Sequence, residues 1–108
     1  MEKYDVIGVM SGTSGDGLDL AACTFTKKDS SWAFEIKKSK TISFPEVMGK
    51  LLSSAFQLSP FELAKLDVDF GSWVGEQINT FLTELNFRPL AVCAHGHTVF
   101  HQPKLGFS

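Results

Sequence analysis

Glycines, hydroxyl groups and carboxylates alternate in one short stretch near the N-terminus. The stretch is Ser11-Gly12-Thr13-Ser14-Gly15-Asp16-Gly17-Leu18-Asp19, and it directly follows a short apolar run. Glycines permit positive φ and let backbone N–H groups converge on phosphate oxygens, while the hydroxyls of Thr13 and Ser14 add donors. The carboxylates of Asp16 and Asp19 can hold Mg²⁺ beside that phosphate. The stretch therefore predicts a phosphate-binding loop, against the alternative of a flexible hairpin connection that binds nothing.

Two common phosphate-binding motifs do not fit this stretch. Gly12 and Gly17 have the spacing of a P-loop, but Leu18 and Asp19 stand where that motif requires lysine followed by serine or threonine. A dinucleotide-binding fingerprint requires a helix after the loop and a third glycine where Leu20 stands. The loop is therefore expected to be of another class.

All three histidines of the chain lie within seven residues, in the segment Ala94-His95-Gly96-His97-Thr98-Val99-Phe100-His101. The segment begins where an apolar strand is expected to end, and ligand sites gather at the carboxyl ends of parallel strands. Three interpretations are open. His95 and His97 have a spacing that can chelate zinc, although no cysteine and no fourth ligand lies close by. They can instead be structural side chains that cap the strand, or they can join Thr98 in exchanging hydrogen bonds with sugar hydroxyls and amides.

Three strands are expected to position the glycine-rich stretch. Short apolar runs with β-branched residues predict strands over residues 4–10 and 20–26. Trp32, Phe34 and Ile36 alternate with less apolar residues, and later apolar positions keep the same parity, which predicts a half-buried third strand. Because the connections are short, the three strands are expected to form an antiparallel meander.

The pattern changes to a helical period after Pro45, where a first helix is expected. Ser59-Pro60-Phe61-Glu62 has the form of a capping box with proline at the first helical position, so a second helix is expected to begin there. Gly71 and Gly75 within it are expected to pack closely on a neighbour, with a kink as the alternative. The apolar run 90–94 then predicts a fourth strand that joins the sheet in parallel through the helical crossover.

The composition excludes several classes of protein. The chain has 108 residues, 44% of them hydrophobic, and a formal net charge of −2. That length supports one small domain, and the charge lacks the excess of basic residues that is typical of nucleic-acid binders. The apolar runs are far shorter than a membrane span of about 20 residues. Cys23 and Cys93 lie far apart without a CxxC spacing and are expected to be two buried thiols.

Two motifs carry a resemblance to a known family. Residues 7–19 resemble the signature Met-Ser-Gly-Thr-Ser-x-Asp-Gly-x-Asp of the anhydro-N-acetylmuramic acid kinases, which have the actin-like (ribonuclease H-like) ATPase fold. The second motif of that family is His-Gly-x-Thr followed by His-x-Pro, which His95, Gly96, Thr98, His101 and Pro103 match. The sequence departs from the family at Gly15, where leucine or methionine is more usual, and at His97, where glutamine is more usual.

The resemblance implies a fold and a set of site residues. The fold class is α/β, a ribonuclease H-like (actin-like ATPase) lobe in the order β-β-β-α-α-β, with an antiparallel three-stranded meander and a parallel fourth strand. In this family the glycine-rich stretch binds the phosphates of ATP. The corresponding residues here are Gly12, Thr13, Ser14, Gly15, Asp16, Gly17, Leu18 and Asp19. Asp16 and Asp19 are the expected neighbours of Mg²⁺. The expected sugar contacts are His95, Gly96, His97 and Thr98.

The resemblance also implies an activity, the ATP-dependent conversion of 1,6-anhydro-N-acetylmuramic acid and water to N-acetylmuramic acid 6-phosphate. The setting would be cytoplasmic cell-wall recycling, with a small-molecule substrate, no nucleic acid or membrane, and room for a homodimer of the full-length protein. The family's general-base aspartate precedes a downstream glycine-rich stretch that nothing here matches. Residues 1–108 are therefore expected to be the N-terminal part of a longer two-lobed kinase, truncated before the C-terminal lobe, without a catalytic residue and inactive alone. The alternatives are a non-catalytic binding domain, or another sugar kinase or ATPase of this fold.

Overall fold

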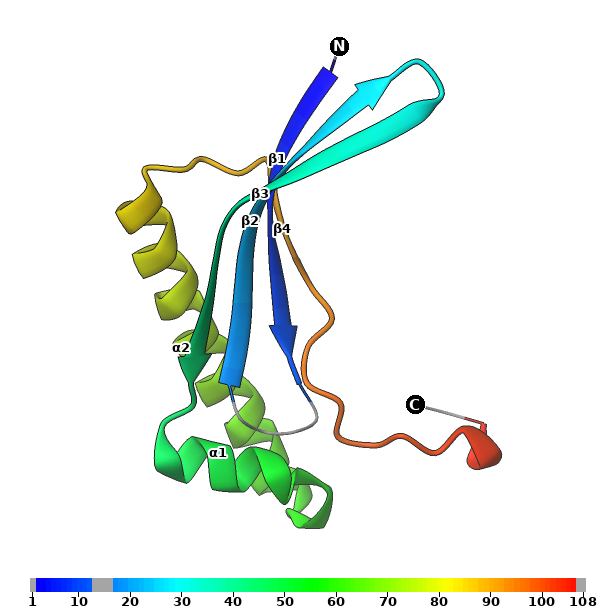
Figure 1. Cartoon of the computed structure of the whole chain (residues 1–108). Helices are drawn as coiled ribbons and strands as arrows, with labels where there is room; N and C mark the ends of the chain where they lie inside the picture. Colours follow the sequence, from blue (N-terminus) through cyan, green and yellow to red (C-terminus); the bar gives the residue numbers. More distant parts are fainter. Residues whose placement is uncertain (1, 13–16, 107–108) are drawn as a thin grey trace.

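The chain folds into a four-stranded mixed sheet with helices on one face (Figure 1). The computed structural model describes residues 2–12 and 17–106. The strands lie in the order β3-β2-β1-β4; β1 pairs antiparallel with β2 and parallel with β4, and β2 pairs antiparallel with β3. The predicted α/β class, the meander and the parallel fourth strand are confirmed. The elements are β1 (Glu2–Ser11), β2 (Gly17–Lys28), β3 (Ser31–Ser43), α1 (Glu46–Ser53), the 3₁₀ turn η1 (Ala55–Gln57), α2 (Pro60–Leu85), β4 (Ala91–Ala94) and the 3₁₀ turn η2 (Pro103–Leu105).

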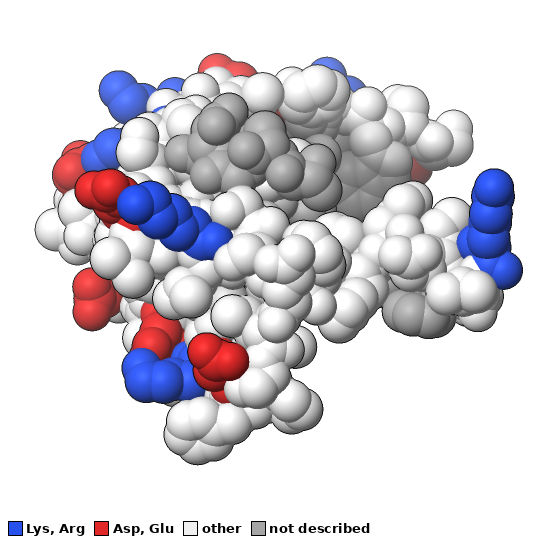
Figure 2. Space-filling model, turned by 90° about the horizontal axis from the view of Figure 1, so that it is seen from below, with Lys and Arg blue, Asp and Glu red and all other residues white. Residues whose placement is uncertain are grey.

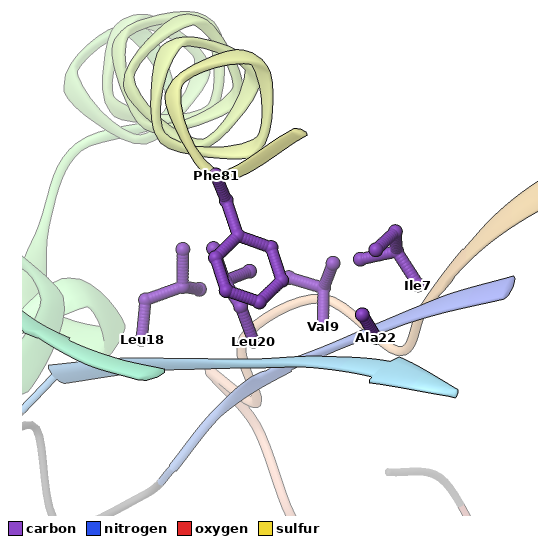
Figure 3. Packing of buried hydrophobic residues seen from close by; sticks show 6 residues of the cluster. All are labelled: Ile7, Val9, Leu18, Leu20, Ala22 and Phe81. Atoms are coloured by element: carbon purple, nitrogen blue, oxygen red, sulfur yellow. The ribbon is translucent and has the colours of Figure 1, made fainter. Parts of the chain in front are cut away.

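The core lies between α2 and one face of the sheet, which we call the covered face. Alternate residues of β1 and β2 point to this face because side chains of a strand alternate in direction. Figure 3 shows Phe81 of α2 reaching down onto these side chains. Phe81 is 1% exposed, so its ring is almost fully removed from water. The buried strand residues of this cluster are Ile7, Val9, Leu18, Leu20 and Ala22.

The opposite face of the sheet, which we call the open face, has no helix against it among the described residues (Figure 1). Its side chains come from the intervening positions, so that Met10 is 53% exposed. The prediction of two buried thiols was wrong: Cys23 is half-buried and Cys93 is exposed, and both are free. Both lie at open-face positions, which no helix of the described chain covers.

β3 does not have one half-buried face as its alternation predicts. A register shift opposite Ala22 and Cys23 places Lys38 across from Ala22 and Ile36 across from Cys23, which leaves one extra residue in β3. Such a bulge reverses the parity of the strand. Ile42 therefore packs on the core, whereas Phe34 lies on the open face and is 68% exposed.

The aromatic residues beyond the bulge contact one another on the β2–β3 hairpin, which extends past the helices in Figure 1. The rings of Phe25 and Phe34 are 6.1 Å apart, and those of Tyr4 and Trp32 are 5.8 Å apart. Trp32 remains 59% exposed. Contacts between side chains on the same face of the sheet, from β2 to β3 for Phe25 and Phe34 and across β2 for Tyr4 and Trp32, account for the alternation there rather than burial under a helix.

The predicted capping box begins α2. The Ser59 hydroxyl accepts from the Glu62 N–H at 3.2 Å, and the Glu62 carboxylate accepts from the Ser59 N–H at 3.1 Å. The expectation that Gly71 and Gly75 pack closely on a neighbour was wrong, because a Cβ at either position would meet nothing within 4 Å. No helix in residues 2–12 and 17–106 has the length and apolarity needed to cross a membrane.

Candidate functional site

The glycine-rich stretch connects β1 and β2 in a hairpin. The two strands pair as far as Ser11 opposite Leu18, and β2 begins at Gly17, so residues 12–16 make the connection. Gly17 begins β2 beside the backbone of β3, where a Cβ would stand only 2.6 Å from the carbonyl oxygen of Ile42. The position therefore requires glycine. The predicted phosphate contacts Thr13, Ser14, Gly15 and Asp16 lie outside the described residues.

Asp19 extends the expected phosphate site onto the open face. Its carboxylate is exposed and accepts a hydrogen bond from the Thr41 hydroxyl of β3 at 2.5 Å. That bond fixes one oxygen and leaves acceptor capacity on the carboxylate. Mg²⁺ in phosphoryl-transfer sites is held by one or two carboxylates, the substrate phosphates and water. The donor set at Asp19 fits that chemistry, and Asp16, the other expected neighbour, is outside the described residues.

An open depression of about 500 Å³ brings the two predicted segments together. β1 and β4 run in parallel, with Val9 opposite Ala94, so both strands deliver their following residues to the same end of the sheet. His95 and Asp19 therefore line the same depression from either side of β1, although 76 positions separate them in sequence. The residues that line the depression are Gly8, Val9, Met10, Asp19, Leu20, Ala21, Cys93, Ala94 and His95.

Gly96 turns the chain away from the sheet immediately after His95. Its φ is +75°, a left-handed conformation that glycine adopts without a steric penalty from a side chain. His95 and Thr98 are both exposed, so their polar groups are available to a ligand. The turn thus separates two exposed polar side chains from the intervening His97, which points elsewhere.

The His97 ring points into the protein. Its Nδ1 lies 2.8 Å from the hydroxyl of Ser11, which is 4% exposed, and its ring contacts Phe70 edge-on at 6.2 Å between centroids. Burial lowers the pKa of His97 below its ordinary value, a hydrogen bond with the Leu52 backbone opposes this shift, and the neighbouring His95 lowers the pKa further. Burial therefore favours the neutral form of the ring.

The surface at the end of the sheet where β1 and β4 finish bears few charges at its centre. In the view from below, most Lys, Arg, Asp and Glu side chains gather toward one side, and the middle of the described surface consists of other residues (Figure 2). Within residues 2–12 and 17–106, no three His, Cys, Asp or Glu side chains form a group that could hold a metal ion. Nδ1 of His97 lies against the Ser11 hydroxyl, which does not favour the zinc interpretation of the histidine pair.

Sequence reasoning missed two polar residues of the site. Ser11 was considered only as the start of the glycine-rich stretch, and Thr41 only as part of a strand. Thr41 faces Asp19 because the register shift at Ala22 and Cys23 moves β3 by one residue, and no local signal in the sequence gives that shift. The contact of Ser11 with His97 depends on the parallel pairing of β1 and β4, and no local signal encodes it.

Comparison with known proteins gives one consistent family. Residues 4–108 match the family model described as anhydro-N-acetylmuramic acid kinase. Proteins of that name from Mannheimia succiniciproducens and Pseudomonas fluorescens are 34% identical over 113 residues and 33% identical over 108 residues, covering 99% and 94% of this chain. The chain spans only 29% and 28% of the length of these two relatives. Because the family model matches almost the whole sequence, this chain belongs to the anhydro-N-acetylmuramic acid kinase family.

Proposed function

We propose that the full-length gene product is an ATP-dependent kinase that converts 1,6-anhydro-N-acetylmuramic acid and water to N-acetylmuramic acid 6-phosphate and ADP. In this reaction water adds to C1, the bond between C1 and O6 breaks, and O6 takes the γ-phosphoryl group. The proton that water loses goes to a general base, which we place outside residues 1–108. The chain would then be the N-terminal part of a two-lobed cytoplasmic enzyme of cell-wall recycling.

The observation that carries this proposal is the shared depression of Asp19 and His95. A kinase must hold the phosphoryl donor and the acceptor side by side, since correct placement supplies much of the rate enhancement. Here the phosphate side of the site follows β1 and the sugar side follows β4, and the two strands are neighbours. The family match and this convergence support the same assignment independently.

In this assignment residues 12–17 and Asp19 contact the ATP phosphates, and His95, Gly96 and Thr98 contact the sugar. Leu18, which the sequence also predicts as a phosphate contact, lies fully buried in the core cluster and is left out of the assignment. Mg²⁺ would be held by Asp19, with Asp16 as its neighbour, and would neutralise charge on the transferred phosphoryl group. The Thr41 hydroxyl orients the Asp19 carboxylate, and His97 belongs to the sugar side through the segment it holds.

The test is the activity of the full-length gene product with Mg·ATP and three sugars: the anhydrosugar, glucose and N-acetylglucosamine. We expect ADP release together with formation of a sugar 6-phosphate only when the anhydrosugar is present, and ³¹P NMR detects that product. Preference for glucose or N-acetylglucosamine would instead support another sugar kinase of this fold. No turnover of any sugar would support the binding-domain alternative.

Asp19 has a matched control within the same sheet. Asp5 also accepts from a cross-strand threonine, Thr24, at 2.7 Å, but it lies away from the depression. We expect Asp19→Asn to lower kcat/KM for Mg·ATP by about 10–100-fold, as losses at metal sites typically do, and Asp5→Asn to leave it unchanged. Equal effects of the two substitutions would contradict the role of Asp19.

A further inference from the structure

His97 connects three elements that are far apart in sequence. It stands after β4, its Nδ1 lies 2.8 Å from Ser11 at the end of β1, and its ring packs edge-on against Phe70 of α2. The Leu52 backbone, in the last turn of α1, bonds the same ring. His97 thus attaches the segment that follows β4 to β1, α1 and α2.

The contact with Ser11 and the effect of Leu52 together indicate the tautomer. The Leu52 backbone favours the protonated ring, so the group that acts on the ring is a carbonyl, an acceptor for a ring N–H. Since Nδ1 faces Ser11, we infer that Nε2 carries the proton. In the neutral ring Nδ1 then accepts from the Ser11 hydroxyl, and the buried Ser11 is satisfied.

We propose that His97 is a positioning residue: through Ser11 and Leu52 it fixes segment 95–98 against the end of β1, and so sets the distance between the sugar contacts and the phosphate loop. This inference rests on the proposed function. It differs from a direct sugar contact, because Nδ1 faces Ser11 and the ring packs against Phe70. His95 and Thr98, on either side, remain exposed and free to face the sugar.

The hydrogen-bond arrangement is tested first on the chain itself. We expect ¹⁵N NMR of the histidine rings at pH 7.5 to find His97 as the neutral Nε2–H tautomer; an Nδ1–H tautomer would overturn the proposal without touching the proposed function. A double-mutant cycle with Ser11→Ala and His97→Phe should give a coupling of about fivefold or more in the unfolding equilibrium constant, since removing one partner strands the other. Additive effects would overturn the contact. Ser53→Ala, an exposed serine bonded to Lys50 in α1, is the control for the serine substitution.

The positioning role is then tested by kinetics of the full-length gene product. We expect His97→Phe, which keeps the ring but no hydrogen bond, to lower kcat/KM for the anhydrosugar by about 10–100-fold and to leave KM for ATP within about twofold. His97→Asn, whose side-chain oxygen can accept from Ser11 where Nδ1 does, should restore much of the loss. Equal kcat/KM for wild type and His97→Phe, or no difference between Phe and Asn, would overturn the proposal. Absence of sugar phosphorylation by the wild type would overturn the proposed function and the positioning role together, whatever the tautomer.

Discussion

Substituting Gly17 by alanine tests the packing at the base of the expected phosphate loop. A Cβ at this position would lie 2.6 Å from the Ile42 oxygen and 3.2 Å from its carbonyl carbon. The first distance is 0.8 Å short of the 3.4 Å at which ordinary van der Waals contact begins. Both atoms belong to the backbone, so no side-chain rotation relieves the clash, and β2 and β3 must separate where Gly17 pairs with Ser43.

The expected cost of Gly17→Ala is about 1–3 kcal/mol, the usual range for overpacking a tight site. Urea unfolding of the chain, followed by the fluorescence of Trp73, which packs beside the core, gives the free energy of unfolding. In the full-length gene product the same substitution should also raise KM for ATP, because Gly17 borders the loop.

Gly71→Ala is the matched control, because it makes the same chemical change where a Cβ meets nothing within 4 Å. Gly71 is exposed in the interior of α2, where alanine is favoured over glycine by about 0.5–1 kcal/mol. The two substitutions should therefore change stability in opposite directions. If Gly17→Ala is neutral or stabilising, or if both variants are destabilised alike, the reasoning from Cβ contacts is refuted.

Three further substitutions test the core and the start of α2. Phe81→Ala should cost about 3–5 kcal/mol in urea unfolding, since it empties the contact between α2 and the sheet. Ser59→Ala should cost about 1 kcal/mol, because the Glu62 N–H loses its acceptor. The hydrogen bonds from the Ser59 backbone and side chain lower the pKa of Glu62, so the stability that its carboxylate provides is present above pH 4.5 and is lost as pH falls through the lowered pKa. Glu62→Gln, which cannot titrate, should therefore flatten the decline in urea midpoint between pH 5 and pH 3, and an unchanged decline would show that Glu62 contributes nothing to it.

Features that depend on neighbours in sequence were predictable. The α2 capping box involves residues three apart, and its serine, proline and glutamate are sufficient to identify it. The short apolar runs over residues 4–10 and 20–26 correctly indicated the strands β1 and β2, and the short connection between them indicated an antiparallel pair. The bulge in β3 was not predictable in this way. The bulge depends on which residue of β2 lies opposite each residue of β3. The alternation of Trp32 and Phe34 does not indicate which face of the sheet their side chains occupy.

The orientation of His97 shows the same limit within the candidate site. His95 and His97 are two apart, so in an extended strand they would share a face, as chelating or sugar-binding histidines would. The left-handed turn at Gly96 breaks that relation and leaves His95 on the open face. His97 then aligns with Val99, which packs in the second apolar cluster beside Leu52 and Phe70. The apolar Val99 two residues after His97 was the available signal that this histidine faces inward. The contact of His97 with Ser11 follows only from the parallel pairing of β1 and β4. The same pairing brings His97 against the end of β1, which the proposed positioning role requires.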